Sequence, residues 1–324
     1  MTYNNPNING SNWSELNILE TLRKRNPLII CITNDVVRTF TANGLLAIGA
    51  SPVMSECSED LEDLIVHASA LLINIGTVTP DKVTYYKEAI TLAKAHEVPI
   101  VLDPVGCHAG AYRLSVVLDL IKTDAISLLR GNQSEIKVIY DALNTNHKID
   151  RSLSGKGVDG EQVEDSAIIT YRLARLINCP VVATGEEDYV SDGTRVFAVP
   201  HGHPIMTAVT GTGCLLGAVL AAFFSSYCPF MYNMPIGEFL AYALAYYGLA
   251  GESAVNVRGV KPGSFSVAFM DALYELDDAM LLSENRIRPV VVPDQLKVYF
   301  ISGTQDVGFN ERHLLDIVEA ACRG

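Results

Sequence analysis

The chain has 324 residues, 49% of them hydrophobic and 19% charged, so it is long and apolar enough to bury a large core. Asp and Glu number 37 against 24 Lys and Arg, which gives a net charge of −13. Nucleic acid or an anionic membrane surface requires a cationic face, and this balance argues against both. An anionic small-molecule substrate stays possible, because it needs only a few local donors.

Neither a targeting segment nor a membrane span is indicated. Residues 1–12 are polar and rich in Asn, without the basic start and apolar stretch of a signal peptide. The longest apolar runs, 215–224 and 239–250, fall short of the roughly 18 residues of a spanning helix. The seven cysteines form no Cys-x-x-Cys pair, which predicts neither a disulfide framework nor a zinc site. We therefore expect a cytoplasmic protein.

From residue 28 onward, short apolar runs typical of buried strands alternate with segments of helical periodicity. The predicted strands are 28–33, 71–75, 99–102, 125–129 and 181–183. The predicted helices are 40–48, 81–95, 112–121, 134–143 and 167–177. Strands that are apolar on both faces imply a mostly parallel sheet with helices on both faces, so the sequence predicts a doubly wound α/β fold.

This alternation changes in the second half of the chain. Residues 144–164 are polar and predict a surface loop. Residues 189–196 alternate around Ser-Asp-Gly and predict a β-hairpin. Three helices are expected after it, at 214–224, 236–255 and 264–281. Near the end, 295–301 predicts a further strand and 311–322 an amphipathic helix.

Polar residues follow the predicted strands. In parallel α/β sheets, ligands bind outside the carboxyl ends of the strands, so these residues are the candidates for a site. They are Asn34, Gly76 with Thr77, Asp103 with Gly106, Arg130 with Asn132, and Thr184 with Gly185.

Residues 210–214 (TGTGC) lead into an apolar helix and are the strongest single feature. Gly211 and Gly213 let the backbone approach a ligand, and the free N–H groups and helix dipole then face an anion. This pattern predicts a phosphate or oxyanion cradle. Taken alone, it is equally compatible with an ordinary glycine-rich turn.

Two carboxylates follow strands in the same region. Asp103 and Glu135 could hold Mg²⁺, directly or through water, beside the phosphates of ATP, and Arg130 is suited to a triphosphate oxygen. The alternatives are that Asp103 only starts a turn and that Glu135 only caps a helix. Their appearance at successive strand ends favours the functional interpretation.

Cys214 stands at the start of the helix that follows the glycine cradle. The helix N-terminus should lower its thiol pKa below the usual value of about 8.5, and such a thiol could orient or deprotonate an alcohol. The simplest alternative is a buried cysteine acting as a small apolar group. A further alternative is a cysteine nucleophile with His201 or His203 as its base.

Many of these residues fall in motifs that resemble those of hydroxyethylthiazole kinases. The motifs are 31–34 (CITN), 49–54 (GASPVM), 73–77 (INIGT), 103–106 (DPVG), 130–135 (RGNQSE), 157–159 (GVD), 188–193 (DYVSDG), 202–204 (GHP) and 210–214 (TGTGC). The resemblance covers about residues 14–288. It implies a ribokinase-like fold and a homotrimer with thiazole sites between subunits. It also implies ATP and Mg²⁺ as reaction partners, and phosphorylation of 4-methyl-5-(2-hydroxyethyl)thiazole in thiamine salvage.

The same resemblance implies a role for individual residues. Asn34, Met54 and Gly211 would bind the thiazole, and Cys214 would lie against its hydroxyethyl oxygen. ATP would be bound by Arg130, Thr184 and Gly213, and Mg²⁺ by Asp103 and Glu135. Cysteine at 214, where most ribokinase-like relatives have aspartate, is typical of the thiazole kinases. Lys261 is a departure, because the family usually has glycine there.

Three segments are expected: a polar extension at 1–13, a kinase domain at 14–288 and a tail at 289–324. The tail resembles the first βα unit of thiamine-phosphate synthase, but one unit cannot close a (β/α)₈ barrel. We therefore expect a fused or truncated reading frame without a second activity. The alternatives for the kinase domain are another ribokinase-like vitamin or pyrimidine kinase and a non-catalytic nucleotide or thiazole sensor.

Overall fold

A computed structural model describes residues 17–144 and 159–292 of the chain. The expected extension at 1–13 and the strand and helix expected at 295–301 and 311–322 lie outside the described residues. Most of the expected loop at 144–164 lies outside them as well. Its last part is a correction, because a helix begins at Asp159.

The centre of the fold is a nine-stranded sheet within the described residues, in the order β2-β1-β3-β4-β5-β6-β7-β8-β9. The strands from β2 to β6 are parallel, and β7, β8 and β9 add to the β6 edge as antiparallel neighbours. Their bounds are β1 Leu28–Ile32, β2 Ser51–Val53, β3 Ala70–Asn74, β4 Ile100–Asp103, β5 Leu128–Asn132, β6 Val181–Thr184, β7 Asp188–Ser191, β8 Val196–Val199 and β9 Arg288–Val290.

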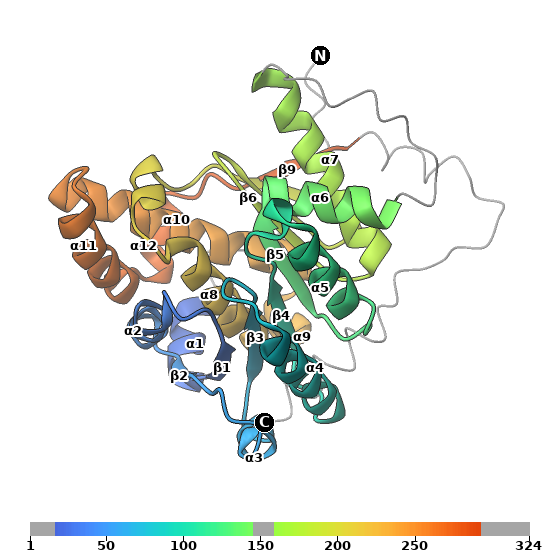
Figure 1. The fold of residues 1–324 in the computed structure, drawn as a ribbon. Helices are drawn as coiled ribbons and strands as arrows, with labels where there is room; N and C mark the ends of the chain where they lie inside the picture. The colour runs from blue at the N-terminus through green and yellow to red at the C-terminus, as the bar shows by residue number, and fades with distance from the viewer. Residues whose placement is uncertain (1–16, 145–158, 293–324) are drawn as a thin grey trace.

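Helices cover both faces of this sheet, as Figure 1 shows. On one face lie α1 (Ile18–Arg25), α2 (Arg38–Ile48), α8 (Thr212–Ser226), α10 (Ile236–Arg258), α11 (Pro262–Glu275) and α12 (Asp278–Ser283). On the other lie α3 (Leu61–Ile65), α4 (Pro80–Ala95), α5 (Ala111–Ile121), α6 (Gln133–Asn144) and α7 (Asp159–Ile177). Short helical turns are η2 (Cys107–Ala109), η4 (Pro204–Ala208) and α9 (Pro229–Tyr232).

The continuous apolar strands explain this layering. Along β1, Ile29 and Cys31 pack into the core under α8 and α10, while Ile30 and Ile32 pack into the core under α4 and α5. Successive side chains of a strand point to opposite faces, so an uninterrupted apolar run requires a helical layer on each side. The predicted doubly wound, mostly parallel architecture is confirmed.

Several boundaries differ from those expected. The helix expected at 264–281 is two helices, because the chain is extended at Leu276 and the Asp277 carboxylate accepts the Met280 N–H (2.8 Å) to begin α12. The strand expected at 125–129 runs from Leu128 to Asn132, so Arg130 lies inside it.

Two strands were missed. β2 has only three residues, all half-buried, and gives too short a pattern to recognise. β9 contains Pro289 and pairs with β8 at the edge of the sheet, where proline is tolerated. It crosses the expected domain boundary between residues 288 and 289.

The carboxyl ends of the parallel strands lie together along one side of the sheet, which is called the sheet edge below. Asn74 is the register partner of Asp103 across β3 and β4, and Asn132 is the partner of Thr184 across β5 and β6. Helix α8 packs closely beneath this edge. A Cβ atom added at Gly217 would lie 3.3 Å from both the Leu72 side chain and the Asp103 carboxylate.

Candidate active site

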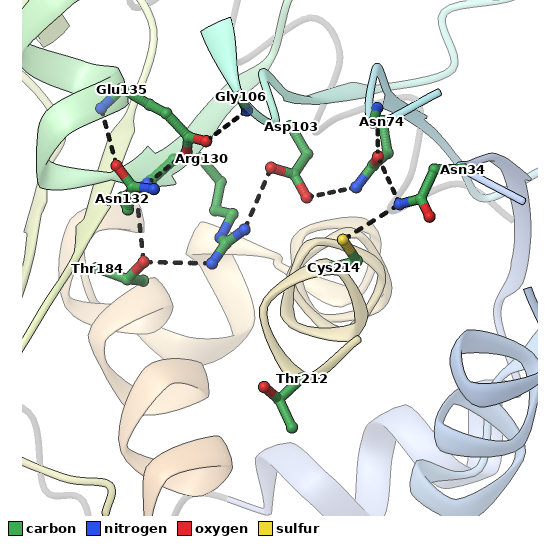
Figure 2. A network of polar contacts seen from close by, with 12 residues as sticks. Asn34, Asn74, Asp103, Gly106, Arg130, Asn132, Glu135, Thr184, Thr212 and Cys214 are labelled. Carbon is green, nitrogen blue, oxygen red and sulfur yellow. Dashed lines mark hydrogen bonds and ion pairs between the residues drawn. The ribbon is translucent and has the colours of Figure 1, made fainter. Parts of the chain in front are cut away.

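A continuous polar network runs along the sheet edge (Figure 2), and its first part surrounds Arg130. The Arg130 guanidinium donates to Asp103 Oδ1 and to Thr184 Oγ1, both at 3.2 Å. Arg130 is 6% exposed and Asp103 is fully buried. Burial raises the pKa of the Asp103 carboxyl above its usual range, while Arg130 opposes this by stabilising the ionised form.

One polar atom of Arg130 remains unsatisfied. Its Nε has no hydrogen-bond partner within the described part of the chain. A buried donor without an acceptor costs about 1–3 kcal/mol. An anionic ligand that accepts from this atom would recover that free energy, and guanidinium is well matched to phosphate oxygens.

The second part of the network joins Asp103 to Cys214 through two amides. Asn74 Nδ2 donates to Asp103 Oδ2 at 2.7 Å, and Asn74 Oδ1 accepts from Asn34 Nδ2 at 3.0 Å. Asn34 Nδ2 also donates to Cys214 Sγ at 3.3 Å. The structure therefore brings Asn34, Asp103 and Cys214 together, as the strand-end argument predicts.

The start of α8 is built by the glycine-rich segment. Gly211 precedes the helix with φ +100°, where an added Cβ would lie 3.1 Å from Val37 and Phe40. Only glycine adopts this conformation readily. Thr212 Oγ1 donates to the Met206 carbonyl at 2.8 Å and fixes the approach to the helix. Gly213 is exposed, and the space beside it is bounded by the Arg130 guanidinium.

The expected low pKa of Cys214 is wrong in this structure. Burial raises the pKa of the Cys214 thiol above its usual value, and the Asp103 carboxylate raises it further. Hydrogen bonds from Asn74 and Asn34 and the charge of Arg130 lower it, but not enough to compensate. The sequence places the thiol at a helix start, whereas its position under a buried carboxylate depends on the packing of α8 against β4.

Glu135 has the local geometry of a helix-capping acid. Its Oε2 accepts the Asn132 N–H at 2.8 Å, while Asn132 Oδ1 accepts the Glu135 N–H at 2.9 Å. Its Oε1 accepts the Gly106 N–H at 2.7 Å, which ties the loop after β4 to the start of α6. Glu135 therefore caps the helix, which is one of the two roles that the sequence allowed. Binding of a metal would be a second role of the same carboxylate.

His201 and His203, the two histidines that the sequence offered as a base for Cys214, have other partners in the structure. His201 instead contacts the Arg286 guanidinium at 2.8 Å and the Glu252 carboxylate at 3.4 Å. The His203 Nδ1 accepts the Ile205 N–H at 3.1 Å. Both rings therefore hold the loop between β8 and η4 in place, which does not favour a cysteine–histidine nucleophile.

Met54 is not brought into the polar network. It follows β2 and packs half-buried against the core, and its carbonyl accepts from Arg38 of α2 at 3.1 Å. Asn74 is the residue that sequence reasoning missed, since it was noticed only as part of a motif. A buried polar residue at the end of an otherwise apolar strand was the signal that could have found it.

The architecture is that of the ribokinase-like proteins. A ribokinase-like superfamily protein from Enterococcus faecalis V583 matches with a TM-score of 0.52 at 14% identity, over 79% of this chain and 93% of that protein. Sequence comparison is more specific, because a model of the Hydroxyethylthiazole kinase family matches residues 19–279. The chain belongs to the hydroxyethylthiazole kinase family.

Individual relatives agree with this assignment. A hydroxyethylthiazole kinase of Streptococcus agalactiae serotype Ia is 48% identical over 267 residues, which covers 82% of this chain and 99% of the relative. Hydroxyethylthiazole kinase 1 of Streptococcus pneumoniae strain CGSP14 is 41% identical over 274 residues, covering 83% and 99%. The solved hydroxyethylthiazole kinase of Pyrococcus horikoshii OT3 is 35% identical, with a TM-score of 0.74 over 85% of this chain and 98% of that one.

The two glycines at the start of α8 are expected to respond differently to substitution. Gly211→Ala should lower the free energy of unfolding by about 1–2 kcal/mol or more, because alanine is strained at φ +100°. Gly213→Ala should be nearly neutral, because its Cβ would meet only Arg130, at an ordinary 3.6 Å. Urea denaturation measures both, and equal losses would contradict this difference.

Proposed function

We propose that this chain transfers the γ-phosphoryl group of ATP to the primary alcohol of 4-methyl-5-(2-hydroxyethyl)thiazole. One observation carries the proposal for the site: a buried arginine with an unsatisfied Nε lies beside the start of a glycine-led helix that presents a thiol. The arginine can bind an anion, and the thiol can contact an alcohol, and the two groups lie on neighbouring elements. Family membership supports the thiazole as the alcohol.

On the phosphate side, we assign ATP to Arg130, Thr184 and Gly213. Arg130 is held by Asp103 and Thr184, so its orientation is set before a nucleotide arrives. The absence of a side chain at Gly213 leaves room beside the guanidinium, and the N–H groups that open α8 favour negative charge there. Phosphoryl transfer depends mainly on positioning and charge stabilisation, which this arrangement suits.

On the alcohol side, Cys214 positions the hydroxyl as a neutral thiol. Its raised pKa disfavours the thiolate, so a hydrogen bond to the alcohol is the contribution we assign to it. A loose phosphoryl-transfer transition state makes little demand on a general base. Asn34, Met54 and Gly211 are assigned to the thiazole.

A homotrimer with thiazole sites between subunits is part of the proposal. Within one subunit Met54 stays apart from the polar network, which fits a pocket that a neighbouring subunit completes. Val36, just before α2, and Leu46, within it, are exposed apolar side chains that an interface would remove from water. No helix among the described residues is long and apolar enough to cross a membrane. Free thiols at six described cysteines support the reducing conditions of the cytoplasm.

The acidic residues suit the Mg²⁺ ion that accompanies ATP. Magnesium usually takes one or two carboxylates, with substrate phosphates and water completing its shell. The described residues hold no group of three acidic, histidine or cysteine side chains arranged for a metal; Asp103 and Glu135 are two buried carboxylates whose charges interact. We propose that they act largely through water, since both already accept protein hydrogen bonds. Bound Mg²⁺ would neutralise charge on the phosphates during transfer.

The direct test is ADP release from Mg²⁺-ATP with 4-methyl-5-(2-hydroxyethyl)thiazole, compared with a hydroxymethylpyrimidine. Turnover with the thiazole alone is expected. Preference for the pyrimidine would assign the chain to another vitamin kinase activity. Clear nucleotide binding with no turnover on the thiazole would overturn the proposal in favour of a sensor.

Cys214→Ala should keep the fold and ATP affinity but lower kcat by about ten-fold to a hundred-fold, at or below the lower range of acid–base contributions. Cys214→Asp should remain active, because a carboxylate can also accept a hydrogen bond from the alcohol. Steady-state kinetics and nucleotide titration of both variants measure this. Loss of ATP binding in either variant contradicts the assigned role.

Glu135→Gln should raise the Mg²⁺ concentration needed for half-maximal rate several-fold, because a charge near the phosphates is lost, while the KM for the thiazole changes little. The matched control is Asp277→Asn, which removes a charge at the start of α12 instead. Metal titrations at saturating ATP measure both. An unchanged metal dependence in Glu135→Gln would assign Glu135 a capping role alone.

A further inference from the structure

Asn74 occupies the centre of the polar network, at the end of β3 and with no exposed surface. Its amide hydrogen-bonds to Asp103 and Asn34 and also lowers the pKa of the Cys214 thiol, and no role in the reaction has yet been assigned to it. A fully buried amide is costly unless its polar atoms are paired. The hydrogen-bond partners of Asn74 therefore indicate why a polar residue is buried at this position.

The carboxamide of Asn74 fits its surroundings in one orientation. Its Nδ2 donates to Asp103 Oδ2, and its Oδ1 accepts both the Asn34 Nδ2–H and the Gly76 backbone N–H at 3.0 Å. Rotating the amide by half a turn would face oxygen to a carboxylate oxygen and N–H groups to two other donors. Asp103 and Gly76 thus fix the direction of the Asn74 amide.

The orientation of the Asn74 amide in turn determines the position of the Asn34 amide. Asn34 uses its Oδ1 to accept the Val36 N–H at 3.2 Å, so its Nδ2 must face the interior. There one N–H is taken by Asn74 Oδ1 and the other points at Cys214 Sγ. The Val36 N–H thus sets which way the Asn34 amide faces, and the Asn74 oxygen holds its nitrogen beside the thiol.

We propose that Asn74 is a positioning residue for phosphoryl transfer: it holds the Asn34 amide so that Asn34 fixes the Cys214 sulfur in register with Asp103. The inference rests on the proposed function, in which Cys214 guides the alcohol. A small misplacement of a reacting group can cost as much as about a hundred-fold in rate. Asn74 is suited to the task because one planar group carries the donor for Asp103 and the acceptor for Asn34.

The test is a double-mutant cycle between Asn74 and Cys214. Asn74→Ala in the parent chain should lower kcat by about ten-fold to a hundred-fold, with the KM for ATP changed less than about two-fold. In the Cys214→Ala background, the same substitution should lower kcat by less than about two-fold, since the group it positions is absent. Equal losses in the two backgrounds would overturn the inference, because Asn74 would then act through Asp103 or the fold.

Two further variants separate positioning from stability. Ser69→Ala is the matched control: Ser69 Oγ accepts the Leu28 N–H at 3.1 Å at the opposite end of β3, so its loss should lower thermal stability and leave kcat unchanged. Asn74→Ser retains a hydroxyl in the buried space and serves if Asn74→Ala does not fold. It should show the same dependence on Cys214, and independence from Cys214 would count against the inference.

Failure of the proposed function has a different signature. If the parent chain does not phosphorylate the thiazole alcohol, the assignment of the reaction fails before any variant is compared. If the parent turns over and the cycle shows no coupling, only the role of Asn74 fails. Nucleotide titration of each variant confirms that the phosphate side is intact in the comparison.

Discussion

The buried ion pair between Asp103 and Arg130 is the interaction on which the site depends. Two charges removed from water are costly unless their remaining donors and acceptors are paired. Thr184 supplies one partner to the arginine and Asn74 one to the carboxylate, and these two residues end strands on either side of the pair. The pair therefore joins four neighbouring strands, from β3 to β6. It also leaves Arg130 Nε without a hydrogen-bond partner among the described residues, so the cation that stabilises the network keeps one donor unused.

The network has two halves with different partners. Toward β5 and β6, the Arg130 guanidinium bonds to Thr184 and interacts with the charges of Asp103, Glu135 and Asp188, so this half is charged. Toward β1 and β3, the amides of Asn74 and Asn34 are neutral and lead to a thiol whose pKa is raised. Separation of charged and neutral groups along one edge matches a reaction in which an anionic donor meets an uncharged alcohol. The order of the strands in the sheet determines which half each residue joins.

The apolar pattern was sufficient to predict the doubly wound architecture, and the strand ends and the glycine-rich segment to predict that Asn34, Asp103, Arg130, Thr184 and Cys214 lie near one another. These features depend on periodicity and on the common direction of parallel strands. The three-residue β2 and the proline-containing β9 could not be predicted, because their pairing comes from neighbouring strands and not from their own composition. The pKa of Cys214 was predicted in the wrong direction, since sequence reveals a helix start but not the carboxylate packed beside it. The connection through Asn74 requires knowing that β3 lies between β1 and β4.

The close contact of Gly217 with Leu72 and Asp103 determines how near α8 lies to the sheet. Cys214 and Gly217 belong to the same helix, so the distance between the Cys214 thiol and the Arg130 guanidinium depends on how near α8 lies to the sheet. Because glycine has no side chain, position 217 allows the closest approach of the helix to the strands. A larger side chain at position 217 would therefore move α8 away from the sheet and change the spacing of these polar groups without replacing any of them.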